Sequence, residues 1–288
     1  MHTMPLKPSK LCFGTAGVPL STPDRNIPNG IVHVRKLGLD AMELEFVRQV
    51  NVSKEKAPDI KKIASANDIL LTCHGQYFIN LNSLEAEKVK ASVGRVLNAA
   101  RIAHLCGGYS MTFHAAYNMD LPADKVYAKV LSEMKSIVRT LKNEGCDIWI
   151  RPETTGKASQ WGTFQEIVKL AGEVEQVLPC VDFSHVHARL AGPANDSKVY
   201  NNYNQFSEIL EYIEKHLGKE ALNNMHCHVS GIEYGLKGEK NHLILQESDM
   251  KYKELMKAFK DFKLKGVVIS ESPNIEGDAK LMQREYEK

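Results

Sequence analysis

Short apolar runs recur along the chain and alternate with longer segments of helical periodicity. Eight runs are rich in Val, Ile, Leu and Phe and begin roughly 30–45 residues apart, a pattern typical of strands in a parallel sheet. They span residues 11–17, 40–46, 69–75, 108–114, 146–153, 179–185, 224–230 and 266–272.

The segments between these runs repeat apolar residues every three or four positions. Residues 83–107 do so with Val89, Val93 and Val96, and residues 124–145 do so before ending at Gly145, which suits a helix C-terminus. Strand alternating with helix over eight units predicts a closed (β/α)8 TIM barrel rather than an open doubly wound sheet. Since no Gly/Ser linker or shift of composition divides the chain, we expect residues 1–288 to form a single domain.

Composition narrows the class of protein. The chain is 43% hydrophobic and 25% charged, values typical of globular proteins. Its formal charge of +2 does not by itself indicate a nucleic-acid partner. Six scattered cysteines without a CxxC pair predict reduced, buried thiols. No signal peptide or run of about 20 apolar residues is present, so we expect a cytoplasmic protein that does not bind membranes.

Six consecutive predicted strands, from the third to the eighth, end in His, Glu or Asp. A lone histidine at a strand end is more often a core residue, but six such endings without a Lys or Arg are hard to obtain by chance. Because the carboxyl ends of barrel strands form the active site, we predict a metal site at this rim. The residues are His74, His114, Glu153, Asp182 followed by His185, His226 and His228, and Glu271.

The residue types indicate the kind of metal. Imidazoles and carboxylates without thiolates suit an exchangeable catalytic site for Zn, Mn or Fe, whereas a closed structural zinc usually takes cysteines. Because each ion would take about three protein ligands, the residues at the strand ends predict two or three ions. His187 lies two residues beyond His185, and we interpret it as a structural residue or a support for a ligand.

Five stretches of the chain resemble endonuclease IV, the metal-dependent apurinic/apyrimidinic endonuclease family of base excision repair. They are CHGQYFINLNS (73–83), TFHAAY (112–117), RPETTGKASQWGTFQEI (151–167), PCVDFSHVHARLAG (179–192) and ISESP (269–273). The resemblance runs from about residue 11 to 282 and implies a (β/α)8 barrel with a trinuclear zinc site. It also implies hydrolysis of double-stranded DNA on the 5′ side of an abasic site, with no obligate protein partner.

The resemblance assigns the first two ions to particular residues. It implies that His74 and His114 hold one zinc together with Glu153, which bridges to a second ion and orients or deprotonates the nucleophile. Zinc is the implied metal, with manganese as a partial substitute. Asp182 and Glu271 would hold the second ion together with a histidine of the seventh strand.

That histidine is ambiguous in the sequence. The family has His-Leu-Asn-Asp at the seventh strand, and this chain reads MHCHVSG, so that His226 and His228 are both candidates. We favour His228, because it is nearer the rim and stands in HVSG where the family motif begins.

The third ion would be held by His185 and His242. Here the chain departs from the family, which has Asp-Arg-His in the loop after the seventh strand. This chain reads GEKNH, so Lys240 stands where an Asp ligand is expected, and Glu239 is the available substitute one position away.

The stretch HGQYF places Tyr77 and Phe78 where the family uses side chains that penetrate the DNA duplex. Such wedges fill the gap left by an extruded nucleotide and offset the cost of unstacking. Core packing is the rival explanation for Phe78. Lys157, Arg189 and Lys240 are possible phosphate contacts, although charged rim residues are common without that role.

Two other functions compete with the endonuclease. Sugar isomerases and epimerases share the barrel, but they need about four ligands for one or two ions and a closed pocket for a polyol, which leaves four of the histidines superfluous. Glu43 and Glu45 on the second predicted strand keep this alternative open, although we interpret them as structural. A protein that binds DNA lesions without cutting is the other alternative, favoured by the Lys at position 240.

Overall fold

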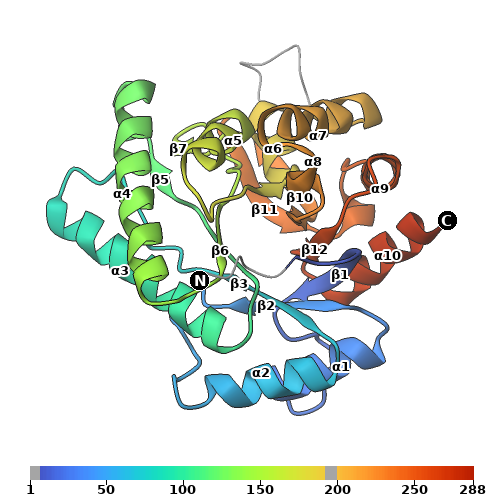
Figure 1. Ribbon diagram of the computed structural model, residues 1–288. Coiled ribbons are helices and arrows are strands. Elements are labelled where there is room, and N and C mark those ends of the chain that lie inside the picture. Colours follow the sequence, from blue (N-terminus) through green and yellow to red (C-terminus); the bar gives the residue numbers. More distant parts are fainter. Residues whose placement is uncertain (1–6, 192–199) are drawn as a thin grey trace.

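The computed structural model describes residues 7–191 and 200–288, and in this part of the chain eight parallel strands form one sheet (Figure 1). Neighbouring strands follow the order β6-β4-β3-β2-β1-β12-β9-β8. The strands are β1 (Leu11–Ala16), β2 (Ala41–Glu45), β3 (Leu70–His74), β4 (Ser110–Phe113), β6 (Trp149–Pro152), β8 (Cys180–Asp182), β9 (Met225–Val229) and β12 (Gly266–Ser270).

The two end strands of this order meet and close the sheet into a barrel. Isolated parallel bridges join Ile150 to Val177 and Glu153 to Cys180, and the Thr154 N–H donates to the Cys180 carbonyl at 3.1 Å. Closure removes the exposed edges that an open sheet would present. The predicted (β/α)8 barrel is therefore confirmed.

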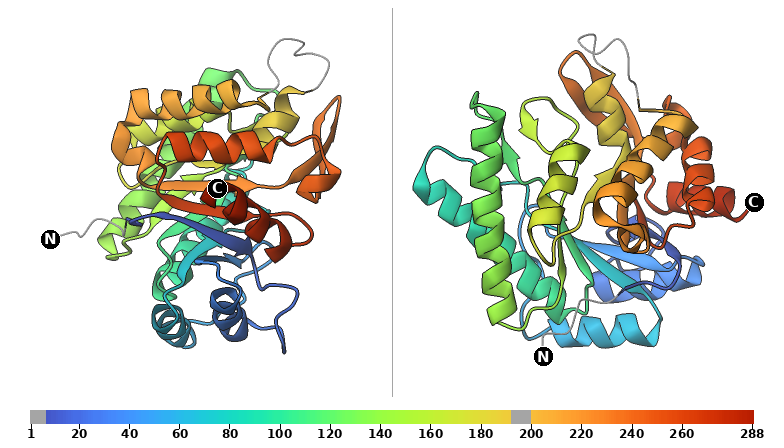
Figure 2. Two further views of the ribbon diagram at one scale, coloured as in Figure 1. Left: turned by 90° about the vertical axis from the view of Figure 1, so that its right-hand side faces the viewer. Right: turned by 45° about the horizontal axis from the view of Figure 1, so that its top comes forward.

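Helices surround the barrel on the outside (Figure 2). The longer ones are α1 (Ile27–Lys36), α2 (Ala57–Ala66), α3 (Ala86–Leu105), α4 (Ala123–Asn143), α5 (Phe164–Glu173), α7 (Tyr203–Leu217), α9 (Tyr252–Asp261) and α10 (Glu276–Glu287). The short ones are α6 (Phe183–Leu190), α8 (Lys219–Leu222) and the 3-10 turn η1 (Leu245–Glu247). Within residues 7–191 and 200–288, no helix is both long and apolar enough to cross a bilayer.

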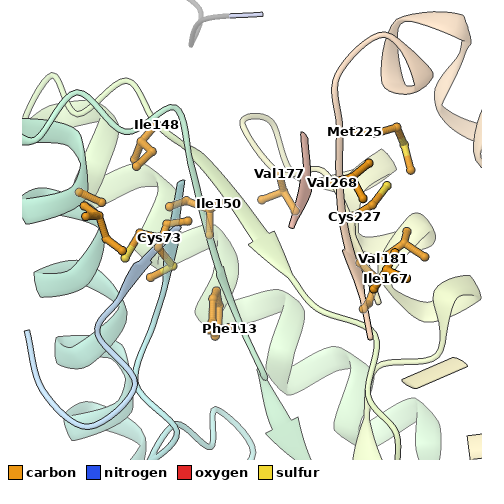
Figure 3. Packing of buried hydrophobic residues seen from close by; sticks show 14 of the residues in the cluster. Cys73, Phe113, Ile148, Ile150, Ile167, Val177, Val181, Met225, Cys227 and Val268 are labelled. Atoms are coloured by element: carbon orange, nitrogen blue, oxygen red, sulfur yellow. The ribbon is translucent and has the colours of Figure 1, made fainter. Parts of the chain in front are cut away.

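Alternation along the strands separates two layers of side chains. Phe13, Met42 and Val268 belong to the large cluster between strands and helices, part of which Figure 3 shows. Cys12 and Val267, their neighbours in sequence, belong to a smaller cluster inside the barrel. All six cysteines are buried and free, as the sequence predicts. Inward-facing positions near the carboxyl ends of the strands are polar, and they form the rim described next.

The sixth predicted strand ends at Asp182, within the apolar run 179–185, and helix α6 begins directly after it at Phe183. The reason is local, because the Asp182 side chain accepts a hydrogen bond from the His185 N–H at 2.6 Å and so caps the helix. His185 consequently lies in the first turn of a helix and not in a loop.

Two antiparallel strand pairs lie outside the predicted pattern. Strands β10 (Gly231–Gly235) and β11 (Gly238–Leu243) form an antiparallel pair after β9, where the sequence suggests only a loop. Strands β5 (Ala116–Tyr117) and β7 (Gln160–Trp161) form a shorter pair between the loops that follow β4 and β6. The β10–β11 hairpin projects beyond the barrel at the right of the left-hand view in Figure 2.

Candidate metal centre

The eight residues favoured as ligands converge at the carboxyl ends of the strands. They form three overlapping groups, and in each group the candidate ligand atoms lie within 4.8 Å of one another. The groups are His74, His114 and Glu153; Glu153, Asp182, His228 and Glu271; and Asp182, His185, His242 and Glu271. The shared members are carboxylates, which are the ligands able to bridge two ions.

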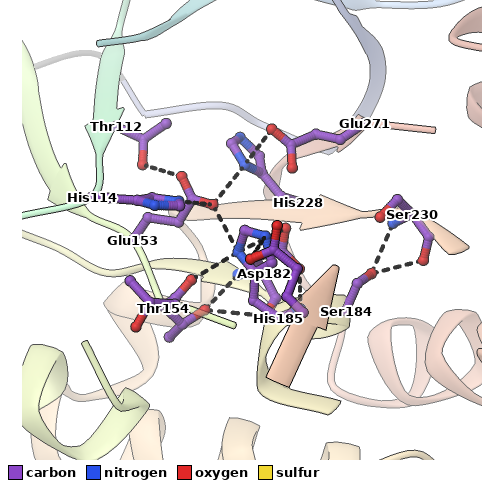
Figure 4. Close-up of polar contacts among 12 residues, drawn as sticks. Thr112, His114, Glu153, Thr154, Asp182, Ser184, His185, His228, Ser230 and Glu271 are labelled. Carbon is purple, nitrogen blue, oxygen red and sulfur yellow. Dashed lines mark hydrogen bonds and ion pairs between the residues drawn. The ribbon is translucent and has the colours of Figure 1, made fainter. Parts of the chain in front are cut away.

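Glu153 lies at the centre of the first group. Its Oε2 is 3.3 Å from His74 Nε2, and its Oε1 is 3.3 Å from His114 Nε2. The His74 Nδ1–H donates to the Gly75 carbonyl at 2.7 Å, which leaves the Nε2 lone pair directed at the group. Figure 4 shows the Glu153 carboxylate lying among the rings of His114, His185 and His228.

The second group takes its histidine from β9. Pairing between β8 and β9 sets Asp182 opposite His228 and Cys180 opposite His226. His228 therefore lies at the level of the carboxylates, with its Nδ1 3.2 Å from Glu271 Oε1 and 3.5 Å from Glu153 Oε1. His226 faces the same interior one step deeper, where its Nδ1 contacts Ser110 Oγ at 2.8 Å.

The third group combines helix α6 with the β10–β11 hairpin. His185 Nε2 is 3.4 Å from His242 Nε2 and 3.6 Å from Glu239 Oε2. Each ring is oriented by a backbone carbonyl, because His185 Nδ1 donates to Thr154 at 3.0 Å and His242 Nδ1 donates to Glu271 at 3.1 Å.

A β-bulge places Glu239, and not Lys240, beside this group. Glu233 pairs with Asn241 and Tyr234 pairs with Glu239, so Lys240 is the extra residue of β11. Lys240 and Asn241 consequently both turn outward and contact the Glu233 carboxylate, Lys240 at 3.2 Å and Asn241 at 3.1 Å. Glu239 and His242 share the inward face.

The donor set fits a divalent cation. Among the described residues, Asp182 Oδ2, His228 Nδ1 and Glu271 Oε2 are buried and form no hydrogen bond. Burial lowers the pKa of His74, but Glu153 and Glu45 outweigh it and raise that pKa to about 10. Burial also raises the pKa of Glu271 well above its usual range, and Glu153 and Asp182 add to this effect. Closely spaced carboxylates that lack hydrogen bonds are stabilised by bound cations.

The two aromatic residues of the rim are exposed. Tyr77 is 56% exposed and its ring meets that of His74 edge-on at 5.7 Å, while Phe78 is 69% exposed. Core packing therefore does not explain Phe78. The role of both residues in DNA binding stays a prediction.

Of the basic residues considered as phosphate contacts, Arg189 is hydrogen-bonded to groups within the protein. Its half-buried guanidinium donates to Thr155 Oγ1 at 2.7 Å and to the carbonyls of Lys157 and Gln160 at 2.6 and 2.9 Å. These hydrogen bonds hold the loop between β6 and α5. Lys240 contacts the Glu233 carboxylate. Lys157 is half-buried in the loop between β6 and α5.

His187 lies on α6 outside the three candidate ligand groups. It is buried on α6, and its Nε2 is 3.0 Å from Asp249 Oδ1, which makes it a donor to that carboxylate. Tyr234 packs against its ring at 5.0 Å and donates its hydroxyl to Asp249 Oδ2 at 2.6 Å. These contacts attach the β10–β11 hairpin to the helix that carries His185.

Sequence reasoning undervalued two acidic residues on β2. Glu43 is buried against His226 and His228, and the Oε1 atom of Glu45 is buried without a hydrogen bond. Burial and the neighbouring Glu43 raise the pKa of Glu45 to about 7. The available signal was alternation, because in the run AMELE both acids share the inward face with Ala41.

Comparisons with known proteins agree with this architecture. A family model described as xylose isomerase-like TIM barrel matches residues 31–287. The uncharacterized protein MJ0133 of Methanocaldococcus jannaschii is 42% identical over 276 residues, which cover 96% of this chain and 97% of that protein.

Two solved structures share the fold at low sequence identity. Endonuclease IV from Thermus thermophilus is 19% identical, with 95% of this chain and 97% of that chain covered and a TM-score of 0.70. A D-tagatose 3-epimerase-like protein is 17% identical, with 94% and 96% covered and a TM-score of 0.71. Identities this low support the fold and leave the reaction to be argued from the site.

Proposed function

The chain belongs to the xylose isomerase-like TIM barrel family, and from this premise we propose that it is a metal-dependent apurinic/apyrimidinic endonuclease. Its substrate would be double-stranded DNA with an abasic site, cut on the 5′ side of the lesion. The observation that carries the proposal is the set of three overlapping ligand groups that share Glu153, Asp182 and Glu271. Such a set has donors for three zinc ions, with manganese as a partial substitute.

The extra histidines favour this reaction over sugar chemistry. A one-ion or two-ion site would be complete with Glu153, Asp182, His228 and Glu271. Four histidines would then have no function, although backbone carbonyls orient the rings of three of them, His74, His185 and His242. The fourth is His114. Oriented imidazoles at a rim are typical of ligands.

The residues of the site have distinct parts in the proposed reaction. Bound divalent ions would lower the pKa of water and neutralise charge on the phosphate and on the departing oxygen. Glu153 would orient or deprotonate the attacking water as an ionised carboxylate, because His228 and His114 overcome the effect of burial and hold its pKa well below the usual range. Tyr77 and Phe78 would enter the duplex and replace the extruded nucleotide.

Incision of a duplex with a single abasic site tests the proposal. With zinc or manganese supplied, we expect cleavage on the 5′ side that leaves a 3′-hydroxyl. Glu153→Gln should lower the rate about 100-fold or more, the usual effect of losing a general base. Glu144→Gln is the matched control, because that exposed carboxylate pairs with Arg101 away from the site.

The possible results separate the alternatives. No incision by protein with a full metal complement would reject the endonuclease. Tight binding of an uncut abasic duplex would instead identify a protein that recognises lesions without cutting. Epimerisation of a ketose together with one or two ions per chain would identify a sugar epimerase, a function to which the buried carboxylate of Glu45 could contribute.

A further inference from the structure

Glu43 lies inside the barrel and contacts both histidines of β9. Its Oε1 is 2.9 Å from His228 Nε2, and its Oε2 is 3.0 Å from His226 Nε2. The Thr72 hydroxyl donates to the same Oε2 at 2.7 Å. All four side chains are fully buried. Strands β2 and β9 are not neighbours in the sheet, so these contacts cross the barrel interior.

The contact determines which nitrogen of His228 is free. The Oε1 atom of Glu43 is 2.9 Å from His228 Nε2, and an ionised carboxylate at this distance can only accept a proton from an imidazole. The other neighbour of His228 Nε2 is His226 Nε2 at 3.2 Å, so this nitrogen faces the barrel interior and not the candidate ligand groups. His228 Nδ1 forms no hydrogen bond and faces Glu271 and Glu153 at 3.2 and 3.5 Å.

The other oriented histidines have the opposite arrangement. His74, His185 and His242 each donate Nδ1–H to a backbone carbonyl and present Nε2 to the candidate ligand groups. His228 instead turns Nε2 toward the Glu43 carboxylate and presents Nδ1 to the candidate ligand groups. A carboxylate that accepts from an imidazole fixes its tautomer and makes it a stronger metal ligand.

The same carboxylate contacts His226, which strand pairing places one step deeper than His228. His226 Nε2 contacts Glu43, and its Nδ1 contacts Ser110 Oγ at 2.8 Å, so both nitrogens have partners. A deeper group of Cys180, His226 and His228 is close enough to hold an ion. That group lacks a free imidazole nitrogen on His226, and His228 Nδ1 already faces Glu271.

We propose that Glu43 is a positioning residue that fixes His228 with Nδ1 toward the metal ions and excludes His226 from the ligand set. This inference rests on one part of the proposed function, namely that the centre binds metal ions, and it does not depend on DNA cleavage. It goes beyond that function because it assigns a tautomer, a ligand atom and a supporting residue on β2.

Metal binding by Glu43→Gln tests the inference without any assay of DNA cleavage. We expect the affinity for one ion per chain to fall about 10–100-fold, as is usual when a supporting carboxylate is lost. The other ions should bind as in the wild type. Titration with cobalt(II) would show the change both in stoichiometry and in the d–d absorption of the affected ion.

His226→Gln is the matched control. Glutamine keeps a donor near the position of Nε2, so Glu43 retains a partner, and we expect the full metal complement with an unchanged cobalt spectrum. His228→Gln should lose the same ion that Glu43→Gln weakens. Loss of an ion in His226→Gln, or unchanged affinity in Glu43→Gln, would overturn the inference.

A measurement on the wild type covers the case in which Glu43→Gln does not fold. Long-range proton–nitrogen NMR of the zinc-loaded protein should show His228 bound through Nδ1 and protonated at Nε2, opposite to His74, His185 and His242. Coordination of His228 through Nε2 would refute the role of Glu43. Protein that loads its ions and shows the expected tautomer, yet leaves abasic DNA uncut, would refute the proposed endonuclease alone.

Discussion

At the scale of single residues, Gly156 allows two parts of the candidate metal centre to meet. A Cβ atom at this position would lie 2.6 Å from Glu239 Cβ and 3.2 Å from His185 Cδ2. The Glu239 N–H also donates to the Gly156 carbonyl at 2.9 Å. The hairpin therefore approaches the loop after β6 as closely as backbone atoms permit, and only glycine leaves that space.

Gly156→Ala should move Glu239 and weaken binding of the third ion. We expect a clear loss of affinity for that ion, measured by metal titration, because the added methyl group would meet atoms fixed by the hairpin. Gly94→Ala is the matched control, since nothing lies within 4 Å of a Cβ at that position on α3. That control should keep all ions and gain about 0.5–1 kcal/mol in the free energy of unfolding. Equal metal affinity in both variants would contradict this account.

At the scale of elements, the β10–β11 hairpin brings the Glu239 carboxylate to the third group, where the sequence has a lysine at the expected ligand position. The bulge at Lys240 shifts the alternation of β11 by one residue, so that Glu239 and His242 face inward together. Contacts of Tyr234 and His187 with Asp249 attach this hairpin to α6. The third group thus depends on the relative position of two elements.

Glu239→Gln and Lys240→Gln compare the two neighbouring positions directly. Loss of the Glu239 charge should weaken the third ion by removing a carboxylate 3.6 Å from His185 Nε2. Lys240→Gln should leave metal affinity unchanged, because its exposed side chain pairs with Glu233. Metal analysis after dialysis against a weak chelator would measure both. A larger effect at position 240 would show that the register of β11 is different in solution.

At the scale of the whole molecule, the candidate centre connects distant parts of the barrel. Its members lie on or directly after β3, β4, β6, β8, β9 and β12, on helix α6 and in the hairpin. Ions bound here would stabilise the folded chain because the unfolded chain cannot assemble the same donors. Removal of the ions should therefore lower the melting temperature of the protein.

The size of this decrease should depend on pH. Without metal, the pKa of His74 is raised from 6.5 to about 10, so its ion pair with Glu153 stabilises the fold fully below pH 6.5 and is lost as the pH rises toward 10. Metal binding must displace that proton and so becomes stronger as the pH rises. The difference in melting temperature with and without a chelator should accordingly be larger near pH 8 than near pH 6. A difference that shrinks over this range would argue against displacement of the proton.

The sequence by itself determined the barrel and the chemical character of its rim. Eight apolar runs separated by helical segments are local patterns, and burial alone makes them strands and helices in this order. The residue types at the strand ends, such as Glu153 and Glu271, are likewise visible without a structure. Their exact roles as ligands stay a prediction, although the structure brings them together.

Only the tertiary structure decided how the remaining side chains meet. Glu43 and His228 are far apart in sequence and approach across the barrel interior, a contact that no local pattern encodes. Glu239 turns inward because of a bulge in the pairing of β11 with β10, and pairing partners are chosen by the folded chain. Periodicity and residue type are properties of a segment, whereas tautomer, register and close approach depend on atoms that folding brings from elsewhere.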